Sequence, residues 1–279
     1  GLFKKLVVAE RLAVMVSTIY DYKPQPLEDD PYVGLVVVLG AFLYVGQVYM
    51  DFSGCMDLVI GTSQMFGIPL AENFCRPFTS TSVSEIWRRW HMTLGFWLKD
   101  DLLYPALKSE LFARIRKFCK KHWGKQAAKS VPTYLGLFLT WFCVGFWHGG
   151  TWKYIFGAGL YFFGVIVGGM LLEPLFQRLI KLLNVNTKAW SWTFFQRVRS
   201  FCLFAVGVSI GRRKSLMDGL RAWKTVFTEW NPWVLFDDTI FQLGLDRKDF
   251  DLCMAGIGIV ALVSILQDRY GSVRELVEK

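Results

Sequence analysis

A long apolar run over residues 131–172, broken once near its middle, restricts most strongly what this chain can fold into. The break covers residues 147–153 and contains His148 and Lys153, the only Asp, Glu, Lys, Arg or His side chains in the whole run. Before the break, residues 131–147 form a stretch of 17 residues that would reach about 26 Å as a helix, close to the roughly 30 Å of a bilayer core. After it, residues 154–172 supply 19 more. We therefore expect the chain to cross a membrane, break at His148 and cross back.

His148 is thereby a candidate functional residue, because an ionisable group between two apolar spans is costly to keep there and usually has a role. The alternative is an ordinary loop histidine at the far membrane surface. The position of the residue alone leaves these two interpretations evenly balanced.

The composition is typical of a polytopic helical membrane protein. Of the 279 residues, 53% are hydrophobic and 16% are aromatic, and the mean hydropathy is +0.32. The apolar stretches are continuous, whereas a transmembrane barrel would alternate apolar and polar positions. Residues 32–50 add another uncharged run of 19 residues. We expect an all-α bundle in which residues 1–279 form one membrane domain in contact with lipid.

Residues 58–70 predict a less regular element, because they are apolar but too short to cross a bilayer, and glycines and Pro69 interrupt them. They follow two carboxylates, Asp51 and Asp57, which need a partner or a polar cavity at membrane depth. The pattern favours a re-entrant segment. The two aspartates have a structural alternative, since they could cap helices or pair with arginines downstream.

A capping box at Ser82 and Glu85, a hydroxyl followed three residues later by a carboxylate, predicts a helix start. The helix is expected over residues 83–98, with Trp87 and His91 on one face because of their i, i+4 spacing. Tryptophans and arginines beside a basic segment are typical of a helix that lies at the membrane interface. For His91 the alternative is a histidine that only lies among lipid headgroups.

Residues 99–130 contain nine Lys or Arg and three acidic side chains, which is most of the chain's net charge of +9. Because loops on the cytoplasmic side are enriched in Lys and Arg, we expect a cytoplasmic basic loop. The next span then runs outward, and the span after His148 returns. Nucleic-acid binding is the alternative interpretation of a basic patch, but topology explains the charge more simply in a chain with flanking spans. We expect no nucleic-acid partner.

Three histidines, at positions 91, 122 and 148, are the candidates for chemistry. His122 lies among lysines and is expected to be solvated. A metal site is not expected, since neither the histidines nor the six cysteines show ligand spacing. The chain also lacks a G-x-S-x-G turn, a P-loop and a dinucleotide fingerprint. A neutral imidazole shielded from water is a competent general base toward a hydroxyl. Acyl transfer to a hydroxyl and proton relay in a transporter both remain open.

Four motifs stand out in order along the chain. They are Asp51-Phe-Ser-Gly54 with Asp57, Glu72-Asn73-Phe74 with Pro77-Phe78, the stretch Ser84-Glu-Ile-Trp-Arg-Arg-Trp-His-Met-Thr-Leu94, and Gly145-Phe-Trp-His-Gly149. Together they closely resemble the membrane-bound O-acyltransferase family, above all its bacterial branch of alginate O-acetylation and teichoic acid D-alanylation proteins. The resemblance is strongest over residues 1–164 and implies that the family's N-terminal helices are missing from this chain. It also implies helices around a tunnel, with interfacial and re-entrant segments.

The resemblance assigns roles to individual residues. The family's nearly invariant histidine falls on His148 and its second histidine on His91, which implies that His148 activates the acceptor hydroxyl and that His91 orients the donor. Arg88 and Arg89 are implied to bind a phosphopantetheine phosphate or lipid headgroups. The residues implied to bind substrate or line the tunnel are Trp87, Arg88, Arg89, Asp57, Ser53, Asn73 and Trp147. No metal and no bound cofactor are implied.

The function implied by this resemblance is transfer of an acyl group, with acetyl favoured, from a cytoplasmic thioester to a hydroxyl of an extracytoplasmic polysaccharide or cell-wall polymer. The donor would be acetyl-CoA or an acyl carrier protein, and an accessory acyltransferase is a further expected partner. Transfer of D-alanine to teichoic acid is the alternative within the enzyme class. A non-enzymatic transporter or membrane scaffold is the alternative outside it. The expected location is the bacterial cytoplasmic membrane, crossed several times.

Overall fold

The computed structural model describes residues 1–22 and 32–270, and the regular elements of these residues are helices. Four of these helices are long and apolar enough to cross a membrane: Leu35–Met65, Glu110–Trp147, Trp152–Leu182 and Arg247–Gln267. The expectation of an all-α membrane protein is therefore confirmed. The chain forms two compact units, one made of Gly1–Arg76 with Met217–Lys279 and the other of Pro77–Leu216.

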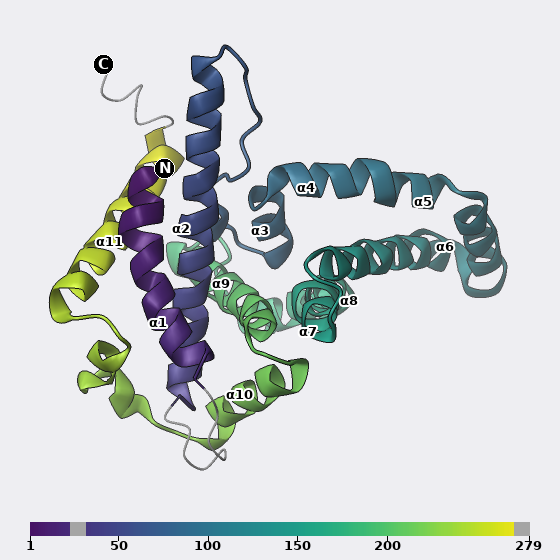
Figure 1. The fold of residues 1–279 in the computed structure, drawn as a ribbon. Helices are drawn as coiled ribbons and strands as arrows, with labels where there is room; N and C mark the ends of the chain where they lie inside the picture. Colours follow the sequence, from purple (N-terminus) through teal and green to yellow (C-terminus); the bar gives the residue numbers. More distant parts are fainter. Residues whose placement is uncertain (23–31, 271–279) are drawn as a thin grey trace. The chain divides into compact units, whose positions relative to one another are not determined.

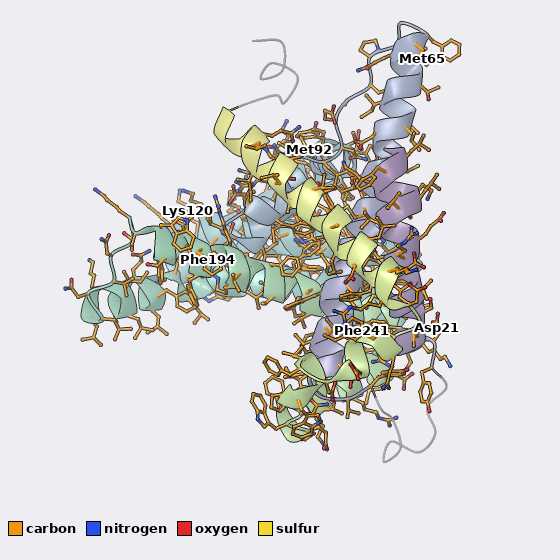
Figure 2. The ribbon with its side chains drawn as sticks, turned by 90° about the vertical axis from the view of Figure 1, so that its left-hand side faces the viewer. Asp21, Met65, Met92, Lys120, Phe194 and Phe241 are labelled. Carbon is orange, nitrogen blue, oxygen red and sulfur yellow. The ribbon has the colours of Figure 1, made fainter. Side chains whose placement is uncertain are left out.

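The first unit packs a short N-terminal helical pair against two long helices (Figure 1). Its elements are η1 (Phe3–Ala9), α1 (Glu10–Tyr20), α2 (Leu35–Met65), α10 (Leu216–Thr228), η6 (Pro232–Leu235), η7 (Asp238–Gln242) and α11 (Arg247–Tyr270). On α1 the side chains of Leu12, Met15 and Ile19 are fully buried. Their spacing places them on one helical face, which packs against α2 and α11. The end of α2 extends beyond these neighbours, and its last residue Met65 is 85% exposed (Figure 2).

α2 continues without a break past Asp51 and Asp57, so residues 58–65 belong to this helix and are not a separate short segment. The re-entrant placement expected for residues 58–70 stays a prediction. Both carboxylates are paired with lysines of η1. Lys5 binds Asp51, and Lys4 Nζ lies 2.9 Å from an Asp57 carboxylate oxygen. Because an ion pair offsets the cost of a carboxylate in an apolar helix, the helix has no need to end there. The partners are upstream lysines and not the downstream arginines that the sequence suggested.

The second unit gathers most of the predicted site residues. Its elements are η3 (Pro77–Thr79), α3 (Val83–Arg89), α4 (Met92–Trp97), η4 (Leu98–Leu103), α5 (Tyr104–Lys108), α6 (Glu110–Trp147), α7 (Trp152–Tyr154), η5 (Ile155–Leu160), α8 (Tyr161–Leu182) and α9 (Trp190–Arg212). The two apolar runs on either side of His148 are helical, as predicted. They form the second part of α6 and the continuous stretch of α7, η5 and α8.

Residues 99–130 are helical almost throughout, so this basic segment is not an irregular loop. Its cytoplasmic location stays a prediction. These residues form most of η4, all of α5 and the first part of α6, which begins where Ser109 Oγ accepts a hydrogen bond from the Phe112 N–H at 3.4 Å. The abundant charges are interleaved with apolar residues at helical spacing, including Phe112, Ile115 and Cys119. This spacing supports an amphipathic helix, which the count of charges alone does not reveal.

Candidate functional site

α3 begins as the capping box predicts. Ser82 Oγ accepts a hydrogen bond from the backbone N–H of Glu85 at 3.1 Å. In return, the Glu85 carboxylate accepts one from the backbone N–H of Thr81 at 2.9 Å. These bonds satisfy amide groups that the first turn of any helix leaves unpaired, and so they fix where α3 starts.

The two arginines of α3 differ in their surroundings. Arg89 lies 2.7 Å from a carboxylate oxygen of Glu85 and also donates to Thr79 Oγ1 at 2.9 Å. Arg88 is exposed. Arg89 is therefore engaged by α3 and η3, and Arg88 is the arginine of this pair that is open to a phosphate or a headgroup.

The single helix predicted over residues 83–98 is broken at Trp90 and His91, so that prediction is wrong. Trp90 has an extended backbone, and His91 is left-handed with φ 50° and ψ 51°. Trp90 is buried with its ring centroid 5.2 Å from that of Phe204 and 6.0 Å from that of Phe78. Because this packing comes from distant parts of the chain, it overrides the local helix preference. Trp87 and His91 consequently do not share the face of one continuous helix.

The left-handed backbone makes position 91 selective for certain side chains. Asn and His tolerate this region, whereas a β-branched residue there is strained by roughly 1–2 kcal/mol. We expect His91→Asn to keep the thermal stability of the wild type and His91→Val to lower it by about that amount, measured by thermal unfolding in detergent. Ser84→Val, on the regular backbone of α3, is the control. Equal stability of the two position-91 variants would contradict the left-handed assignment.

Trp87 lies in an aromatic cluster that joins α3 to α6, α8 and α9. Its ring centroid lies 5.1 Å from that of Trp141, 4.9 Å from Phe162 and 5.4 Å from Phe204. Its Nε1 atom is buried and has no hydrogen-bond partner among the described residues. A buried indole N–H without an acceptor is uncommon, and a bound polar group or water would satisfy it.

Two glycines bring η5 into backbone contact with α6. A Cβ on Gly159 would lie 2.5 Å from the carbonyl oxygen of Trp141, and a Cβ on Gly145 would lie 2.6 Å from Ile155 Cα. Helices in membranes use small residues for such close crossings. The crossing holds together the two helical segments that flank the turn of His148, and so fixes the position of this turn.

The opposite side of η5 is also packed, although less closely. A Cβ on Gly157 would lie 3.1 Å from both the backbone nitrogen of Gly211 and a side-chain carbon of Ile210 in α9. η5 is therefore enclosed between α6 and α9, with a glycine on each side. The sequence analysis missed these glycines, although their close spacing inside an apolar run was a readable signal of tight packing.

The turn after α6 brings His91 and His148 together around Trp147. The ring centroids of His91 and Trp147 lie 5.9 Å apart, and those of Trp147 and His148 lie 4.9 Å apart. After His148 the chain reverses through Gly149 and Gly150, whose φ angles of 150° and 68° favour glycine. One indole thus contacts both candidate catalytic imidazoles.

Both imidazoles favour the neutral form. Burial lowers the pKa of His91, and the nearby His148 lowers it further. His148 is exposed, yet the protein atoms around its ring desolvate it enough to lower its pKa as well. A neutral imidazole is the form that can accept a proton, so the pair retains base capacity at a lower pH than free histidine does.

The other predicted residues line a pocket in the first unit. This pocket has a volume of about 550 Å³, lies beside the first residues of η1, and includes Ser53, Asp57 and Asn73 in its wall. Ser53 Oγ is buried and has no hydrogen-bond partner among the described residues. Asp57 is paired with Lys4, which also lines the pocket. The structure therefore brings the predicted residues together in two groups, one in each unit.

Comparison with known proteins gives relatives over nearly the whole chain, although no family model matches it. The chain is 32% identical over 270 residues to the probable alginate O-acetylase AlgI of Pseudomonas syringae pv. tomato. It is 32% identical over 155 residues to the peptidoglycan O-acetyltransferase of Helicobacter pylori. It is 34% identical over 128 residues to the teichoic acid D-alanyltransferase of Bacillus subtilis.

These matches cover between 44% and 96% of this chain, and less than half of each relative. The alginate O-acetylase match covers 96% of this chain and 45% of that protein. The peptidoglycan O-acetyltransferase match covers 56% of this chain and 25% of that protein. The D-alanyltransferase match covers 44% of this chain and 30% of that protein. The chain thus spans less than half the length of these curated relatives. All three are acyltransferases by name, and they differ in the polymer on which they act.

Proposed function

The chain belongs to the membrane-bound O-acyltransferase family, and we propose that the protein is a membrane enzyme that transfers an acyl group to a hydroxyl of a polysaccharide or cell-wall polymer. One observation supports this most directly. His91 and His148 come from separate helical segments and meet around the ring of Trp147. Two neutral imidazoles at one place suit proton transfer from a hydroxyl, which is the step that ester formation requires.

In this proposal His148 is the general base and a thioester is the donor. His148 accepts the proton of the acceptor hydroxyl as the hydroxyl oxygen forms its bond to the thioester carbonyl carbon. The carbon–sulfur bond then breaks, and the departing sulfur takes up the proton from His148. The products are an ester on the polymer and a free thiol. His91 orients the donor, and the exposed Arg88 binds its phosphate.

The acyl group in this proposal is acetyl. Relatives that match 82% and 96% of this chain, at 31% and 32% identity, are named probable alginate O-acetylases. The teichoic acid D-alanyltransferases match 44% of the chain at 34% identity and 67% of it at only 25% identity. The donor is acetyl-CoA or an acylated carrier protein on the cytoplasmic side, and the acceptor polymer lies outside. The enzyme lies in the bacterial cytoplasmic membrane and works with an accessory acyltransferase. D-alanyl transfer to teichoic acid is the competing outcome of the test below.

The test measures transfer directly in membranes that contain the full-length protein. Membranes receive radiolabelled acetyl-CoA, and in a parallel reaction a labelled D-alanyl carrier protein, together with hydroxyl polymers. We expect label from the acetyl donor to appear in polymer as an alkali-labile ester, at a rate well above that of membranes without the protein. Label from the D-alanyl donor alone would replace the acetyl assignment. Histidine-dependent proton flux without any labelled ester would show a transporter and reject the enzyme.

A further inference from the structure

α6 consists of two helices and not one. Its 38 residues would reach about 57 Å as a straight helix, far more than the roughly 30 Å of a bilayer core. Gly124, with φ 87° and ψ 180°, has a non-helical backbone and divides it. The chain changes direction at this division (Figure 1). Residues 125–147 suffice to cross a bilayer, and residues 110–123 form a separate helix at one end of that span. We call residues 110–123 the basic helix.

The basic helix has two opposite faces. At 100° per residue, Leu111, Phe112, Ile115, Phe118 and Cys119 fall on one side, and the cationic residues fall on the other. The apolar side is itself divided. Phe112 and Cys119 are buried, and α5 packs against α6 in this unit, whereas Leu111 is 64% exposed and Phe118 53% exposed. An apolar strip is therefore left uncovered beside the cationic face.

A tryptophan extends this strip to the end of the basic helix. Trp123 is 63% exposed, and its ring meets that of Phe118 edge-on with centroids 5.6 Å apart. It lies next to the Gly124 division, where the spanning part of α6 begins. Tryptophan at the junction of a span and a polar segment is typical of the membrane–water interface.

Most of the cationic side chains at the basic helix form no ion pair with other described residues. Lys117, Lys120 and Lys121 of the basic helix, and Lys125 directly after Gly124, are exposed and make no ion pair with another described residue. Arg116 donates to the Leu107 carbonyl at 3.1 Å, and Arg114 has one exposed pairing with Glu110 at 3.5 Å. The acids nearest in sequence are Glu110 on this helix and Asp100 and Asp101 on η4. The surface therefore keeps a strong excess of positive charge.

We propose that the basic helix binds the anionic surface of a bilayer, with its apolar strip at the boundary of headgroups and acyl chains and its lysines on lipid phosphates. Two observations select lipid over an acidic protein or a nucleic acid. The helix is joined directly to a membrane span, and its exposed strip is apolar, which charge attraction to a soluble partner does not require. This inference does not depend on the acyltransferase proposal.

The test places the full chain in nanodiscs of phosphatidylcholine with or without phosphatidylglycerol. The protein carries fluorinated tryptophan, and the resonance lost in Trp123→Phe is assigned to Trp123. Nitroxide-labelled lipid broadens this resonance when the ring lies at the headgroups. We expect strong broadening with phosphatidylglycerol, weaker broadening without it, and release at high salt because salt screens exposed charges. Equal broadening in both bilayers, or none in either, would overturn the proposal.

A charge variant gives an independent check. Combined replacement of Lys117, Lys120, Lys121 and Lys125 by Gln should weaken association of the basic helix with anionic lipid by about fivefold per lysine. The control replaces the exposed Lys181, Lys188, Lys214 and Lys224 by Gln, which removes the same charge elsewhere. In this control the Trp123 resonance should broaden as much as in the wild type. If the first variant also does so while its other tryptophan resonances show a folded chain, the lysines do not bind lipid and the proposal is wrong. If it does not fold, the salt titration of the wild type decides.

Discussion

His148→Ala should lower acyl transfer by the full-length protein by a factor of about 10²–10⁴, because a positioned general base contributes this much to proton transfer. The exposed position of His148 makes the replacement tolerable for folding, so expression and membrane insertion should stay unchanged. The measurement is the rate of labelled ester formation in membranes, corrected for the amount of protein present.

The chain offers a matched control for this replacement. His122 is also an exposed histidine of the second unit, and it lies away from Trp147 on α6. His122→Ala should transfer at the wild-type rate. His91→Ala should lose less activity than His148→Ala, since His91 orients the donor in the proposed mechanism and does not take the proton. Wild-type transfer by His148→Ala would remove His148 from the chemistry and with it the proposed mechanism.

Gly159→Ala should destabilise the protein by about 1–3 kcal/mol or more, as inserting a carbon into a packed contact does. The added Cβ would lie 2.5 Å from the backbone oxygen of Trp141, and backbone cannot move aside as a side-chain end can. Relief requires η5 and α6 to separate, and this moves the turn that bears His148. We therefore expect a lower midpoint of thermal unfolding in detergent together with a lower transfer rate of the folded fraction.

Replacing a nearby glycine distinguishes the effect of packing from the effect of helix propensity. Gly164 lies one helical turn further, in α8, and a Cβ there would meet nothing within 4 Å. Gly164→Ala should be neutral or should raise stability by up to about 1 kcal/mol, since alanine favours helix over glycine. If both alanine variants unfolded at the same temperature, the close crossing of η5 and α6 would be refuted.

The apolar runs and the capping box were sufficient to predict much of the fold. Two uncharged stretches on either side of His148 became helices, and Ser82 begins α3. The continuity of α2 could not be predicted in this way, because it depends on Lys4 and Lys5 reaching Asp57 and Asp51 from a different helix. Pairing between distant residues leaves no local pattern.

The candidate site was predictable in its residues but not in its geometry. Composition and spacing singled out His148, and the family motifs added His91. The sequence gives no local sign of the left-handed backbone of His91, because no glycine or proline, which would mark a helix break, occurs in residues 87–93. It follows from the packing of Trp90 on Phe78 and Phe204, which are distant in sequence. The meeting of both imidazoles at Trp147 depends on the same packing.

The enclosure of η5 has a consequence for which parts of the second unit can move. Gly157 and Gly159 are two positions apart, so they face opposite sides of one helix and press it against α9 and α6 at once. A segment packed on both sides is not free to move as a lid, so we expect the neighbouring turn that bears His148 to keep its position. Any widening of the second unit must therefore come from other parts of its helices, and Pro174 within α8 is a natural place for such bending.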